Sequence, residues 1–330
     1  MEIKKRVSAM TVALLFMVGM FFSGWGQSEA KAAAVKYPEK EVTLICPWNP
    51  GASADIQARA LAKAASKYLK KPMVVVNQDG AGGIVATTQM KSAKPDGYTM
   101  ALGVIGLFTT QPILNKSLGY KQSDFDFLLS ITSAPCSIVV NANSPWKTLD
   151  DLVKDAKATN KTINYGTSGA NTTPQLAGAQ FFQMAGVKNQ HIPFTGGAPA
   201  MTALLGNKVD ACAVVVSDAI PQIKAGTMRA LALASEKRMP TLPDVPTMKE
   251  KGYDYALTVR WYVFAPKGLS AEVKNILVDT LQKAVADPEF KKAAEDLYIA
   301  VDVMSAEETV NNFNAQIPIL QKLISSPPQK

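Results

Sequence analysis

Residues 42–55, which read VTLICPWNPGASAD, decide the fold. Val42 to Cys46 is a short apolar run typical of a buried strand, and Pro47 to Ala54 follows as a turn of small residues. The next segment, Ile56 to Leu69, has helical periodicity, and Ser53 is its expected N-cap. We expect its apolar face to hold Ile56, Ala60, Ala64 and Tyr68. A strand, a turn and a helix in this order form the unit of a parallel sheet covered by helices.

The same unit recurs along the chain. Thr148 and Asp151 have capping-box spacing at the start of one helix, and Pro174 and Gly186 mark the two ends of another. Pro318 should kink or interrupt the last helix, which Ser305 caps. The further strands expected are residues 73–76, 98–102, 137–140, 162–165, 190–194, 209–216, 229–233 and 258–264. The further helices expected are a stretch between Gly83 and Pro95, residues 148–159, 174–185, a short helix between the strands 209–216 and 229–233, residues 270–286 and the segment after Ser305.

The chain is too long for one hydrophobic core. Its 330 residues predict an α/β protein of two lobes, each a mostly parallel sheet flanked by helices. The first lobe should comprise residues 36–136 plus 259–330, and the second residues 137–258. The chain should cross between the lobes near 134–140 and 259–265.

The N-terminal residues have the layout of a secretory signal peptide. Lys4, Lys5 and Arg6 precede an apolar run from Met10 to Phe22, and small residues follow up to Ala32. The apolar run is shorter than the roughly 20 residues that a membrane-spanning helix needs, so a cleaved peptide (residues 1–32) is favoured over a retained anchor. No cysteine lies near the cleavage region to carry a lipid. We therefore expect an exported, soluble protein.

Composition argues against several classes of protein. Removing residues 1–32 takes away four basic and two acidic residues, so the net charge falls from +8 to about +6. The remaining basic residues are dispersed, which does not favour nucleic-acid binding. Three widely spaced cysteines, Cys46, Cys136 and Cys212, form no metal motif and are expected to be buried thiols. A bridge between Cys136 and Cys212 stays open as an alternative.

Three turns share one design in which a strand ends, small residues follow and a helix begins. They are Pro50 to Asp55, Gly80 to Gly83 and Gly166 to Thr173. Small side chains expose backbone N–H groups, and a helix N-terminus adds partial positive charge. Ligands of open α/β sheets bind at this end of the strands. The turns therefore predict an anion site, although each alone is also an ordinary connection between a strand and a helix.

Two acidic residues stand apart from the others. Asp55 and Asp218 each follow an apolar strand and open a helix, where a carboxylate either caps the backbone or faces a ligand. Both alternatives stay open for each residue. Trp48, Phe108 and Trp261 could line a ligand site or belong to the core.

Enzymatic interpretations are weaker. The segment from Gly166 to Ala170 resembles a nucleophile elbow around Ser168, but its second glycine comes one residue early. The chain has one histidine, His191, in a strand-like run where a structural role is more common. The turn Gly80 to Gly83 lacks the last glycine of a dinucleotide fingerprint. We expect no catalytic residue, no metal and no cofactor.

Several ordered motifs then make a resemblance specific. They are Tyr37-Pro38, Cys46 to Gly51 with Asp55 and Arg59, Val76-Asn77 with Gly80 to Gly83, Pro95 to Thr99, Tyr165 to Gly169, Pro193 to Ala198, Lys224 to Gly226 and Leu242 to Thr247. In this order they resemble the tripartite tricarboxylate transporter receptor family, also called Bug or TctC-like proteins. The chain departs from the usual family pattern at Ala52, Asn171, Gln175, Thr195 and Tyr262-Val263.

The resemblance implies a two-lobed periplasmic binding protein of the type II, Venus flytrap kind. It implies a monomer that takes up a small carboxylate (a dicarboxylate, a tricarboxylate or an amino acid) and delivers it to a membrane permease of two subunits. The candidate ligand-binding residues are Gly51, Ser53, Asp55, Ala81, Gly82, Gly83, Thr167, Ser168, Gly169, Asn171, Thr172, Thr173, Thr195, Gly196, Gly197 and Asp218.

Two rival functions remain open. The same binding protein could present its ligand to a membrane sensor kinase. Alternatively, Ser168 and His191 could serve an exported hydrolase.

Overall fold

A computed structural model describes residues 36–325, so the expected signal peptide lies outside the described residues. The sheet is mixed, with strand order β2-β1-β3-β9-β4-β7-β5-β6, and β10 and β8 also pair with β4. The strands are β1 (Val42–Cys46), β2 (Met73–Asn77), β3 (Thr99–Val104), β4 (Phe125–Asn141), β5 (Ile163–Thr167), β6 (Asn189–Pro193), β7 (Ala211–Val215), β8 (Met228–Ala234), β9 (Thr258–Pro266) and β10 (Ala300–Met304).

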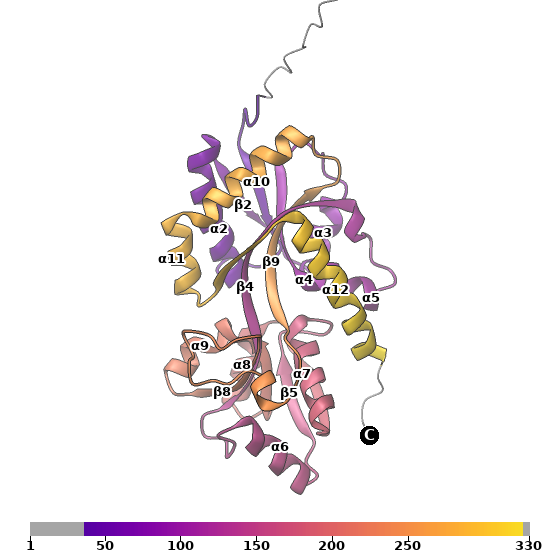
Figure 1. The fold of residues 1–330 in the computed structure, drawn as a ribbon, viewed down its shortest axis with the longest axis vertical. Coiled ribbons are helices and arrows are strands. Elements are labelled where there is room, and N and C mark those ends of the chain that lie inside the picture. Colours follow the sequence, from indigo (N-terminus) through magenta and orange to yellow (C-terminus); the bar gives the residue numbers. More distant parts are fainter. Residues whose placement is uncertain (1–35, 326–330) are drawn as a thin grey trace, which may run out of the picture. The chain divides into compact units, whose positions relative to one another are not determined.

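Helices cover this sheet on both sides (Figure 1). The α-helices are α2 (Ser53–Leu69), α3 (Ile84–Met90), α4 (Ile105–Phe108), α5 (Thr110–Leu114), α6 (Leu149–Ala158), α7 (Thr173–Ala185), α8 (Gly197–Leu205), α9 (Val216–Lys224), α10 (Ala271–Ala286), α11 (Pro288–Asp296) and α12 (Ala306–Ser325). Short 3₁₀ turns are η1 (Ala81–Gly83), η2 (Gln122–Asp124) and η3 (Lys249–Lys251).

The long strand β4 divides the sheet into two halves. Its residues up to Pro135 pair with β9, and its residues from Cys136 onward pair with β7 and β8. We call β1, β2, β3, β9, β10 and the start of β4 the first half-sheet, and β5 to β8 with the end of β4 the second half-sheet. In the first, β1 pairs parallel with β2 and β3; in the second, β5 pairs parallel with β6 and β7.

Several local predictions are confirmed. Thr148 and Asp151 form the expected capping box of α6, and Ser270 accepts a hydrogen bond from Val273 N at the start of α10. The proline and glycine signals also mark the ends of α7. All three cysteines are buried and free. Cys212 lies opposite Val139 rather than Cys136, so the two thiols are about 10 Å apart along the strands, too far for a disulfide.

Other local predictions are wrong. The N-cap of α2 is Ala52, and Ser53 is the first helical residue, with no side-chain cap bond. Of the expected apolar face of α2, Ala64 is buried, but Ile56 and Tyr68 are exposed. The buried face also includes Ala58, Leu61 and Leu69. Because alanines lie on several sides of this helix, the hydrophobic pattern did not single out one face.

The sequence pattern also missed length and continuity. The strand expected at 137–140 is the end of β4, which begins at Phe125. Neither β10 nor α11 was expected, since β10 is short and largely exposed. α12 is continuous through Pro318. Proline has no N–H to donate to the carbonyl one turn earlier, but Pro318 is exposed, so water can bind this carbonyl instead.

Aromatic side chains fill the core beneath α4 and α12. Phe108 stacks on Phe313 with ring centroids 5.6 Å apart and makes an edge contact with Phe127 at 4.8 Å. Phe264 of β9 packs edge-on against Phe108 at 5.1 Å. Phe108 and Trp261 are therefore core residues, with 1 % and 5 % of their surface exposed. Trp48 is partly buried against the separate apolar core that contains Trp261.

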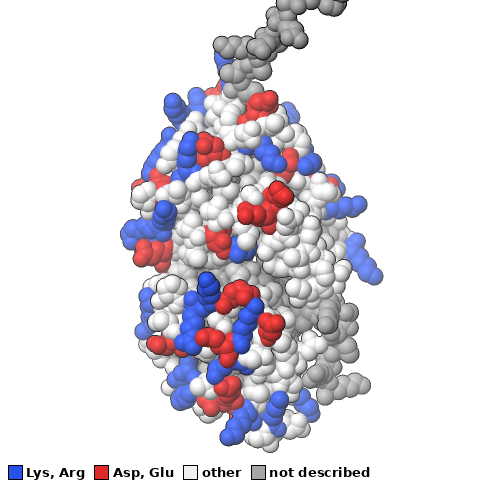
Figure 2. Space-filling model, viewed as in Figure 1, with Lys and Arg blue, Asp and Glu red and all other residues white. Residues whose placement is uncertain are grey.

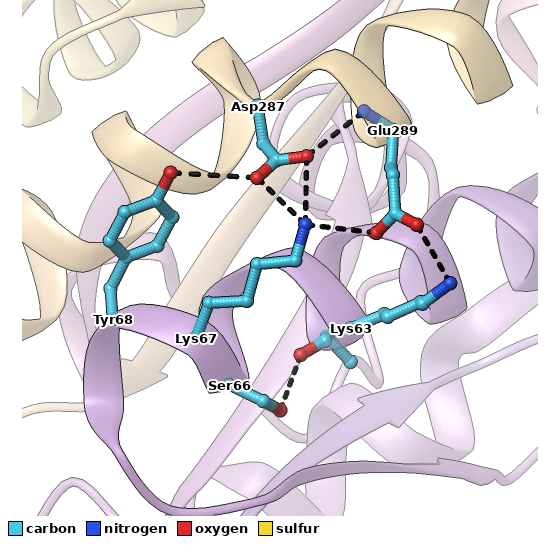
Figure 3. A network of polar contacts seen from close by, with 7 residues as sticks. Lys63, Ser66, Lys67, Tyr68, Asp287 and Glu289 are labelled. Atoms are coloured by element: carbon cyan, nitrogen blue, oxygen red, sulfur yellow. Dashed lines mark hydrogen bonds and ion pairs between the residues drawn. The ribbon is translucent and has the colours of Figure 1, made fainter.

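A network of ion pairs holds the far end of α2 against α11 (Figure 3). Lys67 Nζ lies 3.0 Å from Asp287 Oδ2 and 3.0 Å from Glu289 Oε2, and Lys63 Nζ lies 2.8 Å from Glu289 Oε1. Asp287 also caps α11 by accepting from Glu289 N. These contacts fix the position of α2, whose opposite end starts at the first small-residue turn.

Charges of both signs are interspersed over the face shown in Figure 2. In the second half many belong to ion pairs, such as Lys249 with Glu236 at 2.7 Å and Lys251 with Asp150 at 2.6 Å. No helix within residues 36–325 is both long and apolar enough to cross a membrane.

Candidate ligand-binding site

The carboxyl ends of the parallel strands in both half-sheets lie near the point where β4 passes from one half to the other. Val215, the last residue of β7, pairs with Cys136, the first residue of β4 in the second half-sheet. Val104, the last residue of β3, pairs with Trp261, which is in turn opposite Thr132. Thr132 and Cys136 are four residues apart in one strand, about 13 Å. The ends of β3 and β7 therefore lie close together at the crossing, and the turns after β1 and β2 and those after β5 and β6 lie at the same edges of their half-sheets.

The first turn is organised by Asp55. Its carboxylate accepts hydrogen bonds from Gly51 N (2.9 Å), Arg59 Nε (3.0 Å) and Asn77 Nδ2 (2.8 Å), and only 3 % of its side chain is exposed. Burial alone would raise the pKa of this carboxyl, but the bonds from Arg59, Gly51 and Asn77 hold the pKa below its usual value. Asp55 thus ties β1, α2 and β2 together, while Gly51 turns the chain at a φ of 82°.

The second turn packs directly on the first. Gly80, Gly82 and Gly83 all have positive φ, and a Cβ at Gly83 would lie 3.5 Å from Pro47 of the first turn. Ala81 and Gly82 are exposed, and their N–H groups have no acceptor among the described residues. This turn therefore offers backbone donors to a ligand.

The third turn, after β5, is shaped by its threonines. Thr167 Oγ1 and Thr172 Oγ1 each donate to Gly169 O at 2.9 Å, and Thr172 also accepts from Gln175 N as the N-cap of α7. Asn171 has a φ of 59° and donates its N–H to the Gln175 side chain. Within residues 36–325 no hydrogen bond occupies the side-chain hydroxyls of Ser168 and Thr173. These two hydroxyls are free for a ligand.

The fourth turn, after β6, joins the third through Phe194 N, which donates to Thr167 O at 3.0 Å. Thr195 is exposed, and Gly196 is the N-cap of α8 without any side-chain cap. Gly197 begins that helix, and a Cβ there would lie 3.0 Å from Asp218 Oδ2.

Asp218 stands in the first turn of α9, directly after β7. It does not cap this helix, because α9 has no side-chain cap bond. The described residues include no ion pair or hydrogen bond to its carboxylate, and burial raises its pKa to about 6. The neighbouring Ser217 Oγ is buried and also lacks a partner within residues 36–325.

The two halves approach each other at a position that sequence reasoning missed. A Cβ at Gly106, at the start of α4, would lie 3.5 Å from Thr173 Oγ1 of α7. The sequence contained a signal for this position, because Gly106, like the glycines of the turns, follows a buried strand, β3. Asn77 and Arg59, which hold Asp55, were noticed only as parts of family motifs.

His191 packs beside the third turn. Its Nε2 lies 2.7 Å from Thr167 Oγ1, its ring packs on Tyr165, and burial lowers its pKa. No hydrogen bond joins it to Ser168 among the described residues. Within the same part of the chain, no group of three or more His, Cys, Asp or Glu residues is placed to hold a metal ion.

A surface pocket of about 370 Å³ lies elsewhere in the second half. It contains none of the residues of the four turns. Arg238 and Glu250 in its wall pair with each other at 3.0 Å. Its lining consists of Lys147, Thr148, Ala230, Leu231, Arg238, Asp244, Pro246, Glu250 and Lys251.

Two half-sheets joined by crossing strands, with small-residue turns at the crossing, define the α/β fold of periplasmic solute-binding proteins. Residues 57–325 match the family described as the tripartite tricarboxylate transporter family receptor. The chain belongs to this family. A Cupriavidus necator relative, described as a UPF0065 protein in the gbd 5′ region, is 33 % identical over 270 residues, 82 % of each chain.

Solved structures agree with this assignment. The periplasmic binding protein BugD is 34 % identical with a TM-score of 0.77, covering 87 % of this chain and 97 % of BugD. R. palustris Rpa4515 with adipate is 26 % identical with a TM-score of 0.78, covering 87 % of this chain and 97 % of that one. The fold class and the family expected from the sequence are confirmed.

Proposed function

We propose that this protein is a periplasmic receptor that binds a small carboxylate between two lobes and delivers it to a two-subunit membrane transporter. The observation that carries the proposal is the gathering of four turns rich in free N–H and hydroxyl donors around the β4 crossing. The family assignment and the adipate in the structure of the R. palustris relative favour a carboxylate as ligand.

Neutral donors from both halves bind the carboxylate in this proposal. The first half contributes Ser53 and the N–H groups of Ala81 and Gly82, while Gly51 and Gly83, whose N–H groups are already bonded, shape their turns. The second contributes Ser168, Thr173 and the turn from Thr195 to Gly197. Helix N-termini add positive potential at α2 and α7, whereas the N-terminus of α8 already has the carboxylate of Asp218 beside it. Thr167, Gly169, Asn171 and Thr172 hold the third turn in shape, and Asp55 holds the first.

Binding is coupled to closure of the lobes. The first lobe comprises residues 36–136 plus 259–330 and the second residues 137–258, and β4 and β9 connect them. A ligand that touches both lobes favours the closed state by its differential contacts. The closed form then docks on the transporter. The protein releases its ligand unchanged and uses no cofactor.

Calorimetry and scattering together test this function. The purified mature protein is titrated with mono-, di- and tricarboxylates and with amino acids, and its radius of gyration is measured at saturation. We expect micromolar or tighter binding of at least one carboxylate, a smaller radius and unchanged ligand mass. Absence of binding across the panel would contradict the receptor assignment, whereas turnover of a ligand would indicate an enzyme.

The assignment to the periplasm has its own test. Mass spectrometry of the exported protein should find an N-terminus between Lys31 and Val35. Retention of Met1 on a membrane-bound form would contradict export as a free protein. Uptake of the ligand in a deletion strain, with and without the transporter genes, distinguishes delivery to a permease from presentation to a sensor kinase.

A further inference from the structure

The carboxylate of Asp218 lies beside the start of α8, a position at which the proposed site could otherwise bind an anion. Its Oδ2 is 3.0 Å from the position of a Cβ on Gly197, the first residue of α8. This carboxylate thus lies beside the N-terminus of α8, which has no side-chain cap and carries partial positive charge. A second anion at the same helix terminus would be repelled by Asp218.

Asp218 also lies at the inner end of the site. It follows β7, whose last residue pairs with Cys136 at the β4 crossing, and its charge acts on the Cys136 thiol. Beside it, the Ser217 hydroxyl is buried and has no partner in the described part of the chain. Among the described residues, Asp218 is thus left without a protein partner beside the first residue of α8, and its chain neighbour Ser217 is buried without one.

The charge of Asp218 is unbalanced within residues 36–325. No lysine or arginine occurs in the four turns, and Arg59, beside the first turn, is bound to Asp55. A half-buried carboxylate without a counter-ion is costly, and its environment favours a cation over a second anion. At neutral pH the carboxyl is still mostly ionised, since its pKa is about 6.

We infer that Asp218 determines specificity and that the ligand carries a protonated amine as well as a carboxylate. The ligand's ammonium group pairs with Asp218. The ligand carboxylate binds the free N–H groups of the second turn and the hydroxyls of Ser168 and Thr173. This inference rests on the proposed function and names the ligand class of the same site.

Matched pairs of ligands test the inference. Calorimetry at pH 7.5 compares aspartate with succinate, glutamate with glutarate, 2-aminoadipate with adipate and 4-aminobutyrate with butyrate. In at least one pair the ammonium-bearing member should bind about tenfold or more tightly, the range for a charge-assisted hydrogen bond. Asp218→Asn should reduce this preference about tenfold. Asp254→Asn removes the same charge from an exposed site of the second half and should leave it unchanged.

The outcomes separate this inference from the proposed function. If plain carboxylates bind as tightly as their amino counterparts, or if Asp218→Asn keeps the preference, the inference is wrong while the receptor function stands. If no member of any pair binds, the receptor function fails and the inference with it. Melting curves without ligand check the fold of Asp218→Asn. If that variant does not fold, Asp218→Ser takes its place. The wild-type affinity ratio within each ligand pair also tests the inference without any variant.

Discussion

Asp55 and Asp218 occupy the same kind of position, after a buried strand and in the first turn of a helix, yet their surroundings differ. Asp55 accepts three hydrogen bonds from Gly51, Arg59 and Asn77, which hold its pKa low. Asp218 has no bonded partner among the described residues, and its pKa is raised to about 6. Partners distant in sequence, rather than the local motif, therefore decide whether such a carboxylate organises a turn or is free for a ligand.

The largest expected effect is on stability. Asp55→Ala leaves the donors of Gly51, Arg59 and Asn77 without their buried acceptor, so we expect a loss of about 2–3 kcal/mol in the free energy of unfolding. Asp218→Asn should leave this free energy unchanged or raise it at pH 7.5, because it removes an unpaired charge. Urea denaturation of both apo variants measures the difference. Equal destabilisation by the two substitutions would mean that Asp218 also has a structural role.

The contrast between the two carboxylates also marks the limit of sequence-based prediction. Hydrophobic periodicity, glycines and caps were enough to predict the alternating strands and helices, the α/β fold and three of the four turns. They could not assign roles to Asp55 or Asp218, because Asn77 lies 22 residues from Asp55 and the contact of Asp218 with Gly197 spans two elements. Gly106 was missed for the same reason, since its neighbour Thr173 belongs to the other half of the sheet.

The second-largest expected effect distinguishes residues of the second half that contact the ligand from a residue that shapes the third turn. Ser168→Ala and Thr173→Ala should each weaken ligand binding by about 1.5–3 kcal/mol, the range for a hydrogen bond to a charged group. Thr172→Ala removes the N-cap of α7 and should instead cost about 1 kcal/mol of apo stability. Calorimetry and thermal melting of the three variants test this assignment. Wild-type affinity in both Ser168→Ala and Thr173→Ala would remove these hydroxyls from the site.

A smaller effect follows from the titration of Asp218. Its pKa is raised to about 6, so between pH 4 and pH 6 the native state binds more protons than the unfolded state. The contribution of Asp218 to apo stability therefore rises as the pH falls from 7.5 to 5. Affinity for an ammonium-bearing ligand should fall over the same interval, by about tenfold, because only about a tenth of the carboxyl stays ionised at pH 5.

Asp218→Asn should abolish both trends. Burial lowers the pKa of His191, and the contribution of this group is common to wild type and variant and cancels in the comparison. If the variant keeps the full pH dependence of binding, another group than Asp218 is responsible.

The smallest expected effect is that of salt, and it tests the neutral character of the site in both halves. Arg59, the basic residue beside the first turn, is held by Asp55 and by Asn77 Oδ1, and the four turns contain no lysine or arginine. N–H groups, hydroxyls and helix termini should therefore bind the ligand carboxylate, and pairing of an ammonium group with the half-buried Asp218 is only weakly screened. We expect the dissociation constant to change less than about threefold between 10 mM and 150 mM sodium chloride, by calorimetry at pH 7.5. Arg59→Gln should change this salt dependence little, although it weakens the first turn. A tenfold or greater loss of affinity would instead mean that a solvent-exposed basic residue outside the four turns binds the ligand, and a basic side chain that reaches the site on closure would have to be identified.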